Sequence, residues 1–305
     1  GYVAETVGML TEKGWTYEKD GALWLNTTEL LKAKFMREGK TQEQVDKLDL
    51  KDDVLRRANG FYTYFAADIA YHRNKFEVRG FDRVINIWGA DHHGHVARLK
   101  GAMDALGLNG TERLDIVLMQ LVKLMQDGEV VRMSKRTGKA VSLTDLLDMV
   151  PVDACRYFFN AKPETQMEFD LGLAVREDSE NPVYYVQYAH ARIKSILKAL
   201  AQDNIPTDVK SADLSLLVEG SELDLIRDLS RLPEEIRLAA VQRDPSRLNR
   251  YASQVATAFH KFYTDCRIKD AAPALREARI LLSCCTAAVI ENALSCFGVS
   301  APDHM

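Results

Sequence analysis

A short apolar strand, a turn and an amphipathic helix follow one another between residues 84 and 107, and this unit constrains the fold most strongly. Residues 84–88 (VINIW) are almost continuously apolar, which predicts a parallel strand covered on both faces. Residues 89–91 predict a turn, and apolar residues at helical spacing then continue until Gly107, where the helix should end. A strand that leads directly into a helix is typical of α/β folds, so we expect the first half of the chain to be α/β.

Polar side chains follow this strand at its carboxyl end: Asp91, His92, His93 and His95. Open α/β sheets bind ligands at that edge. One interpretation is a metal site, which we disfavour because consecutive histidines of a regular helix cannot both face one ion. A second is that the histidines only cap the helix and pack against its first turn. A third is nucleotide binding, and the residues alone leave these alternatives open.

The chain from Asn181 onward carries only helical patterns. Apolar residues recur at helical spacing in stretches around residues 186–200, 223–232, 248–262 and 275–289. Amphipathic helices with polar connections predict a helix bundle. The predicted fold class is therefore α/β followed by all-α.

Composition limits the possible classes of protein. The 305 residues are 47% hydrophobic and 28% charged, which is typical of a soluble globular protein and large enough for two domains. Without a leader or a long apolar run, we expect a cytoplasmic protein with no membrane partner. The five cysteines lack C-x-x-C spacing, which disfavours disulfides and a cysteine zinc site. The net charge of −4 argues against indiscriminate nucleic-acid binding but permits a local RNA site.

Tyr64 and Asp68 lie four residues apart and share one face if residues 66–72 are helical. A hydroxyl and a carboxylate on one face could hold a cationic substrate. The alternative is a surface tyrosine and an aspartate that caps a helix, and the spacing alone favours that alternative.

Residues 130–141 (VVRMSKRTGKAV) carry four cations together with a serine, a threonine and a glycine. Such a segment suits a loop that closes over phosphates, because backbone N–H groups cradle the oxygens and a lysine offsets charge that develops in phosphoryl or nucleotidyl transfer. The alternative is a solvated basic loop. Ser142 and Asp145 predict a capped helix directly after the segment.

Arginine and aromatic residues gather in the predicted bundle. The arginines are Arg231, Arg237, Arg243, Arg247 and Arg250, and the aromatic residues near helix faces are Tyr188, Tyr251, Phe262 and Tyr263. Guanidinium groups contact phosphates and aromatic rings stack on bases, so an RNA-binding surface is one interpretation. A scaffold or dimerisation bundle is equally supported by these residues alone.

Arg132-Met133-Ser134-Lys135-Arg136 resembles the KMSKS signature of class I aminoacyl-tRNA synthetases, in the form MSKRTGKAV that is found in arginyl-tRNA synthetases. Three further segments resemble the same family and occur in the family's order along the chain: DGALW at residues 20–24, GADHHGHVARLK at 89–100 and NPVYYVQYAHARI at 181–193. Ala274-Leu275-Arg276 is similar to the D-A-L-R motif of the family's anticodon-binding bundle, although Pro273 occupies the aspartate position. The resemblance therefore extends over the whole chain.

The resemblance implies a partial Rossmann-like catalytic domain over residues 1–150, a segment that contacts the tRNA stem over 151–180, and a helical anticodon-binding bundle over 181–305. It implies ATP-dependent activation of arginine, with Mg²⁺, and transfer of arginine to tRNA(Arg), and it implies no DNA partner. By resemblance, the arginine-binding residues would be Tyr64, Asp68 and His92, the ATP-binding residues Gly89, Asp91, His95 and Met133, and the catalytic residues Ser134 and Lys135. The tRNA-binding residues would be Tyr188, Arg247, Tyr251, Phe262 and Met305.

Residues 92–95 (HHGH) also fit H-x-G-H, another class I signature. In the family that signature lies far upstream of KMSKS, whereas here the two segments are close, so we interpret residues 89–95 as the later adenosine-binding segment. The chain is then expected to be a carboxy-terminal fragment, without the true H-x-G-H motif and with little activation activity alone. Two alternatives are a stand-alone RNA-binding helical module and an unrelated nucleotidylyltransferase that uses His92 and His95.

Overall fold

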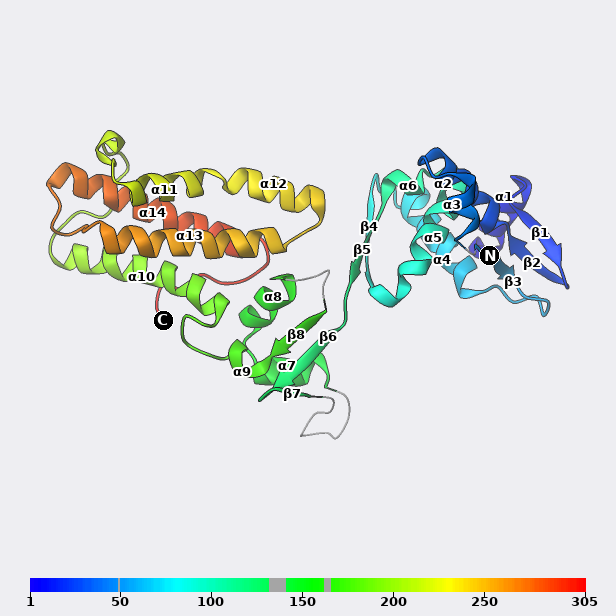
Figure 1. The fold of residues 1–305 in the computed structure, drawn as a ribbon, viewed down its shortest axis with the longest axis horizontal. Helices are drawn as coiled ribbons and strands as arrows, with labels where there is room; N and C mark the ends of the chain where they lie inside the picture. Colours follow the sequence, from blue (N-terminus) through cyan, green and yellow to red (C-terminus); the bar gives the residue numbers. More distant parts are fainter. Residues whose placement is uncertain (49, 132–140, 162–165) are drawn as a thin grey trace. The chain divides into compact units, whose positions relative to one another are not determined.

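The computed structural model describes residues 1–305 except 49, 132–140 and 162–165. The described residues form two compact units, Gly1–Met119 and Gln120–Met305 (Figure 1). Each unit has its own cluster of buried apolar side chains.

The first unit combines short strands with helices. Its elements are α1 (Tyr2–Glu12), β1 (Thr16–Lys19), β2 (Ala22–Leu25), α2 (Thr27–Arg37), α3 (Gln42–Asp46), β3 (Asp53–Arg56), α4 (Tyr64–Arg73), the π-helical turn η1 (Asn74–Val78), β4 (Val84–Gly89), the 3-10 turn η2 (Ala90–His92), α5 (His93–Leu106), α6 (Gly110–Arg113) and β5 (Leu114–Met119). Strands β1, β2 and β3 form an antiparallel sheet. The turn between β1 and β2 lies at Asp20 and Gly21, whose positive φ angles of 53° and 74° suit a two-residue hairpin turn.

Strands β4 and β5 pair in parallel, in a register that runs from Val84 opposite Leu114 to Gly89 opposite Met119, and α5 connects them. The predicted strand, turn and helix are therefore confirmed, and α5 ends at Gly107 with a left-handed φ of 86°. The prediction that both faces of β4 are covered is wrong for the described residues. Val84 and Asn86 face the core, but Ile85 and Ile87 are 49% and 67% exposed, because no described element of this unit packs on their side. An apolar run does not by itself reveal which face is covered.

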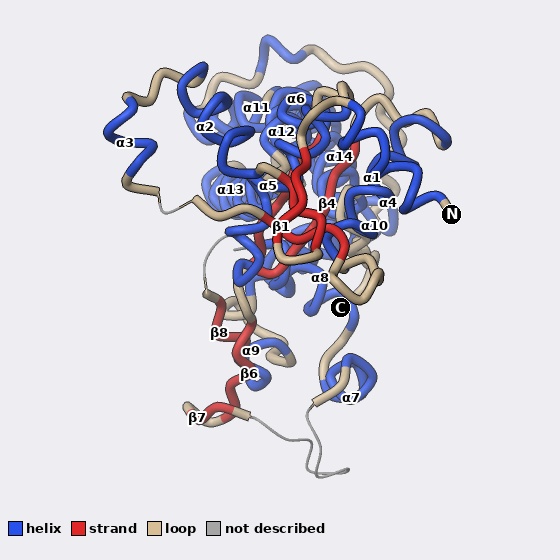
Figure 2. The backbone as a smooth tube through the Cα atoms, turned by 90° about the vertical axis from the view of Figure 1, so that its right-hand side faces the viewer, coloured by secondary structure: helices blue, strands red, loops and turns tan. Residues whose placement is uncertain are grey.

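The second unit begins with a small sheet and continues as a bundle. Its elements are β6 (Val122–Gln126), β7 (Glu129–Val130), α7 (Leu143–Met149), α8 (Val152–Ala161), β8 (Met167–Asp170), α9 (Leu171–Ala174), α10 (Pro182–Gln202), the 3-10 turn η3 (Leu214–Leu216), α11 (Gly220–Ser230), α12 (Leu232–Gln242), α13 (Ser246–Asp265) and α14 (Pro273–Ser295). Figure 2 shows β6, β7 and β8 as one group, with β6 antiparallel to β7 and parallel to β8.

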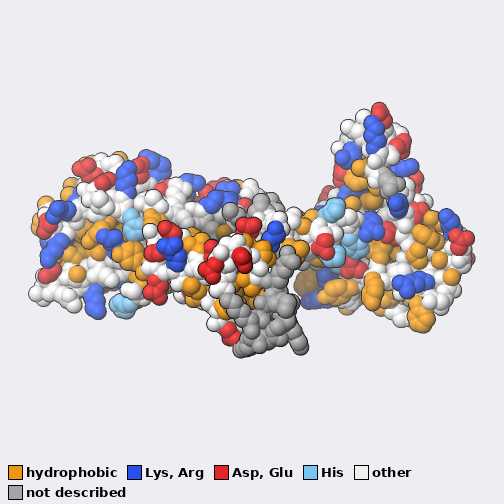
Figure 3. All heavy atoms as spheres, turned by 60° about the horizontal axis from the view of Figure 1, so that its bottom comes forward, with side chains coloured by type: hydrophobic (Ala, Val, Ile, Leu, Met, Phe, Trp, Pro, Cys, Tyr) orange, Lys and Arg blue, Asp and Glu red, His pale blue; other side chains and the backbone are white. Residues whose placement is uncertain are grey.

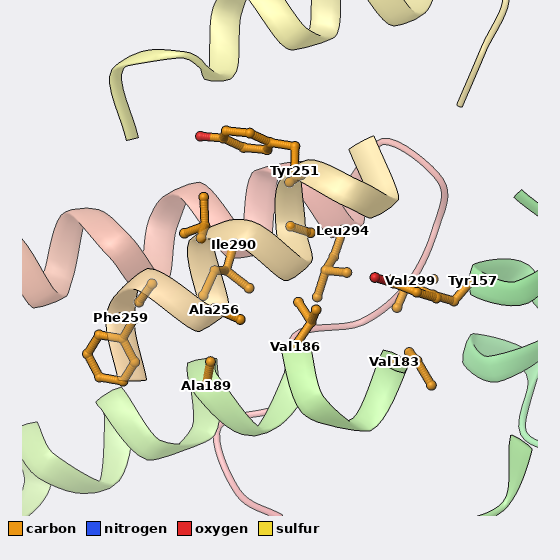
Figure 4. Close-up of a cluster of buried hydrophobic side chains, with 14 of the residues drawn as sticks. Tyr157, Val183, Val186, Ala189, Tyr251, Ala256, Phe259, Ile290, Leu294 and Val299 are labelled. Atoms are coloured by element: carbon orange, nitrogen blue, oxygen red, sulfur yellow. The ribbon is translucent and has the colours of Figure 1, made fainter. Parts of the chain in front are cut away.

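The core of the bundle is built from α10, α13 and α14, as Figure 4 shows for Val186, Phe259 and Ile290. These side chains are 0% exposed, and Val186 and Phe259 lie in stretches for which the sequence predicted helices. The stretch around 223–232 differs from the prediction. It forms two helices, α11 and α12, and α11 buries Leu225 while Leu223 and Ile226 stay 44% and 36% exposed.

Helix α14 is long and apolar enough to cross a membrane, by length and composition alone. In this structure its residues Ala278, Ile280, Ile290 and Leu294 belong to the buried cluster of the bundle. Packing inside a bundle accounts for its apolar character.

The boundary between the two compact units falls between residues 119 and 120 of the chain, before the expected domain limit at residue 150. Strand β6 pairs with β8, and Leu146 and Val150 lie in the same buried cluster as the bundle. The described residues between 120 and 150 therefore belong to the second unit. The functional limits 1–150, 151–180 and 181–305 stay a prediction.

Candidate functional site

Asp68 lies at the centre of a polar cluster in the first unit. It projects from α4, whose N-cap is Thr63, so the alternative that Asp68 caps this helix is wrong. One carboxylate oxygen, Oδ2, lies 2.9 Å from His95 Nε2, and the other, Oδ1, lies 3.2 Å from His72 Nδ1. The Asp68 side chain remains 31% exposed, so a ligand can still approach it.

The pKa of the Asp68 carboxyl is shifted well below its usual range. Burial alone would raise this pKa, but the hydrogen bonds from His72 and His95 outweigh that effect. Asp68 is therefore ionised near neutral pH. An ionised, oriented and accessible carboxylate suits a cationic ligand.

His72 is buried and links α4 to the strand β4. Its Nε2 lies 2.7 Å from Asn86 Nδ2, and Lys75 Nζ lies 3.2 Å from Asn86 Oδ1. The pKa of Lys75 is lowered, because burial and the nearby Arg79 lower it by more than Asp68 raises it. Sequence reasoning missed His72 and Asn86. The available signals were a histidine four residues after Asp68 and an amide inside an apolar strand.

His95 projects from α5 and packs against two aromatic rings. Its ring centroid lies 5.0 Å from that of Phe65 and 5.4 Å from that of Trp88. Its Nδ1 lies 3.4 Å from the Arg98 guanidinium, which also pairs with Asp53. His95 thus connects the α5 segment directly to Asp68, a contact that sequence reasoning did not foresee.

The Gly89 segment lies at the carboxyl end of β4. A Cβ atom at Gly89 would lie 2.5 Å from Asp91 Oδ1, so glycine allows the close approach of this carboxylate. The Asp91 and His92 side chains are 76% and 63% exposed and lie 3.7 Å apart. His92 is the N-cap residue of α5, but its side chain makes no capping hydrogen bond, so the capping interpretation fails for His92. Figure 3 shows histidine and charged side chains gathered on this unit.

Among the residues that the structure describes, no group of three or more His, Cys, Asp or Glu side chains is arranged to hold a metal ion. Met133, Ser134 and Lys135 lie outside the described residues. The predicted capped helix after them is confirmed as α7, with Ser142 and Asp145 forming the capping box, and the strand β7 lies before them.

Aromatic and basic side chains from α10 and α13 line a surface pocket together with the acidic residues Glu177 and Asp178. Tyr184 and Tyr188 stack with ring centroids 6.1 Å apart, and the Arg192 guanidinium lies 5.9 Å from the Tyr188 ring. These residues and His260 line a pocket of about 510 Å³. Burial and the nearby Arg192 lower the pKa of His260. Sequence reasoning identified Tyr188 but missed Tyr184 and Arg192, although both lie four residues from it on α10.

Two predicted tRNA contacts are wrong, because their rings belong to the bundle core. Tyr251 is 2% exposed and Phe262 is 0% exposed, so no base can stack on either ring. The Tyr251 hydroxyl donates to the Asp228 backbone carbonyl instead. Their helical spacing on α13 could have been read as a core stripe.

The arginines of the bundle are also less available than the sequence suggested. Arg231 and Arg247 both pair with the buried Glu235, at 2.7 and 2.9 Å. Arg237 pairs with Glu234, and Arg250 with Asp244. Met305 is 51% exposed and lines a second pocket of about 270 Å³ together with Tyr184. Of the predicted tRNA-binding residues, the structure thus places Tyr188 and Met305 beside Tyr184, while Arg247 is ion-paired.

The helical bundle and the whole chain each resemble known proteins. Residues 186–305 match the family model of the DALR anticodon binding domain. The whole chain is 50% identical to an arginine–tRNA ligase of Ruminiclostridium cellulolyticum and 52% identical to one of Caldanaerobacter subterraneus, and covers 51% of each. The chain therefore spans about half the length of the curated relatives it matches.

A solved structure from Campylobacter jejuni, assigned as an arginyl-tRNA synthetase, has a similar fold. The TM-score is 0.84 at 34% identity, over 99% of this chain and 62% of that chain. The predicted resemblance and the predicted fold class, α/β followed by a helical anticodon-binding bundle, are confirmed.

Proposed function

Because the chain is homologous over its whole length to a part of the arginine–tRNA ligases, we propose that it provides the arginine site and the tRNA-binding bundle of such a ligase. The reaction proposed for the whole enzyme joins arginine to ATP and then transfers the arginyl group to tRNA(Arg). The observation that carries the proposal is the Asp68 carboxylate, ionised and held in place by two histidines.

Asp68 is proposed to receive the guanidinium group of arginine. A carboxylate and a guanidinium make two parallel charge-assisted hydrogen bonds, which a lysine ammonium cannot reproduce. Tyr64 begins the same helix one turn earlier and is 93% exposed, so its ring is available beside the ligand. His92 is proposed to contact the aminoacyl part of the substrate.

The Gly89 segment and the residues 133–135 are proposed to hold ATP with Mg²⁺. Gly89 allows the adenosine to approach the backbone, and Asp91 presents an exposed carboxylate to ribose hydroxyls. His95 contacts Asp68, so it would lie between the arginine and ATP subsites. Met133 and Ser134 would close on adenine and phosphates, and Lys135 would stabilise the pyrophosphate leaving group.

The aromatic pocket of the bundle is proposed to bind tRNA. Tyr184 and Tyr188 form a stacked pair beside Arg192, and Tyr188 is 39% exposed. Exposed rings next to a guanidinium stack on unpaired bases and neutralise phosphates. Met305 lines the neighbouring pocket and would contribute an apolar contact.

The arginine site is tested by isothermal titration of arginine into the 305-residue chain and into Asp68→Asn. The variant keeps the shape of the side chain and removes its charge, so we expect an affinity loss of about 10-fold or more, since a hydrogen-bonded ion pair contributes about 1.5–3 kcal/mol. Asp104→Asn, which removes one charge elsewhere in the same unit, is the matched control and should bind as the parent does. Equal affinity for Asp68→Asn and the parent would refute the assignment.

A further inference from the structure

The two histidines that hold Asp68 face it with different ring nitrogens. His72 faces Asp68 with Nδ1 and Asn86 with Nε2, whereas His95 faces Asp68 with Nε2 and Arg98 with Nδ1. A neutral imidazole carries one proton, and the partners of its two nitrogens decide which nitrogen carries it.

Lys75 fixes the orientation of the Asn86 amide. An ammonium group only donates, so the Asn86 atom that lies 3.2 Å from Lys75 Nζ must be the carbonyl oxygen Oδ1. The Asn86 NH₂ group is then directed at His72 Nε2, at 2.7 Å. Asn86 is 9% exposed, so solvent offers little alternative to this pair of hydrogen bonds.

The orientation of Asn86 determines the protonated nitrogen of His72. An NH₂ group only donates, so His72 Nε2 must accept and the ring proton must be on Nδ1. That proton is donated to Asp68, whose backbone oxygen and Oδ1 lie 2.8 and 3.2 Å from Nδ1. His72 is 2% exposed, so the arrangement is shielded from water.

His95 is held in the opposite way. Its Nε2 lies 2.9 Å from Asp68 Oδ2, and a carboxylate only accepts, so Nε2 carries the proton. Its Nδ1 faces the Arg98 guanidinium, which only donates. The rings of Phe65 and Trp88 fix the plane of the imidazole.

We propose that Asn86 with Lys75, and Arg98 on the other side, hold His72 and His95 as complementary neutral tautomers that orient the Asp68 carboxylate without adding positive charge beside it. These are positioning residues, and their role rests on the proposed function of Asp68 as the guanidinium acceptor. A doubly protonated imidazole would offset the negative charge of Asp68 that attracts the guanidinium. A neutral donor leaves the full negative charge available and fixes the plane in which a bidentate ligand must bind.

The test is ¹⁵N NMR of the histidine rings in the 305-residue chain, with the His72 signals assigned by their loss in His72→Asn. We expect His72 to carry its proton on Nδ1 and His95 to carry it on Nε2. In Asn86→Asp the new carboxylate accepts a hydrogen bond, so His72 Nε2 should become protonated, and arginine affinity should fall about 10-fold, a change of about 1.4 kcal/mol. The matched control is Asn109→Asp, which adds the same charge at an exposed position and should change neither result.

A second pair of variants covers the case in which Asn86→Asp does not fold. His72→Asn places an amide N–H donor near the position of Nδ1 and should retain most of the arginine affinity, whereas His72→Leu removes the donor and should lose it. Equal binding by both variants would overturn the positioning role. A His72 proton on Nε2 in the parent chain, with arginine bound, would overturn the tautomer assignment alone. The expected tautomers in a chain that binds no arginine would instead overturn the proposed function.

Discussion

At the scale of single residues, Asp68 links the candidate site to the stability of the first unit. Burial raises the pKa of this carboxyl, but the hydrogen bonds from His72 and His95 lower it by more. The resulting pKa is below the value of 3.8 for an unperturbed aspartate. In acid the unfolded chain therefore binds a proton at Asp68 that the folded chain does not bind. The free energy of unfolding must fall as the pH falls below that value.

This linkage predicts a difference between the parent and Asp68→Asn. We expect the Tm of the parent, followed by circular dichroism, to fall more steeply than that of the variant between about pH 5 and about pH 3, where an aspartate of ordinary pKa titrates. The other carboxylates titrate in both proteins, so the comparison isolates Asp68. Parallel Tm profiles would show that the folded and unfolded states bind protons equally at this position.

The family resemblance, and not the spacing, singled out Asp68 as an arginine-binding residue, and neither identified its partners. Helical spacing placed Tyr64 and Asp68 on one face, and the structure has both on α4. The contacts of Asp68 with His72 and His95 depend on how α4, β4 and α5 pack, and no local pattern encodes that packing. Asn86 is the clearest example. The role of an amide inside an apolar strand can be inferred only once the structure shows that it bonds to Lys75 and His72.

At the scale of elements, α10 and α13 show the limit of reading aromatic residues as binding residues. Tyr188 on α10 is 39% exposed, whereas Phe262 on α13 is 0% exposed. Both residues follow helical spacing, and only the packing of each helix against its neighbours decides which ring faces solvent. The regular pattern along α13 predicted the helix correctly and the role of its rings wrongly.

This contrast yields a paired prediction for alanine variants. Phe262→Ala should lower the free energy of unfolding by about 3–5 kcal/mol, measured by urea denaturation, because it leaves a cavity in the core. Tyr188→Ala should change stability by about 1 kcal/mol or less. It should weaken tRNA binding by about 1–3 kcal/mol if one base stacks on this ring. Unchanged tRNA affinity in Tyr188→Ala would remove this residue from the proposed tRNA surface.

At the scale of the whole molecule, the chain consists of an α/β unit and a unit dominated by a helical bundle. The sequence predicted this order because strand and helix patterns differ in period and are separated along the chain. It did not predict that β6 and α7 belong to the same unit as the bundle, since the pairing of β6 with β8 joins segments about 45 residues apart. The two proposed binding sites, for arginine and for tRNA, lie in different units.

The first unit is proposed to recognise the guanidinium group of arginine through Asp68. Isothermal titration of the unmodified chain with arginine and with citrulline, its uncharged isostere, tests this most directly. We predict that arginine binds and that citrulline binds at least about 10-fold more weakly, because citrulline leaves the Asp68 carboxylate without a charged partner. Equal binding of the two amino acids, or binding of citrulline alone, would show that Asp68 does not recognise the guanidinium group.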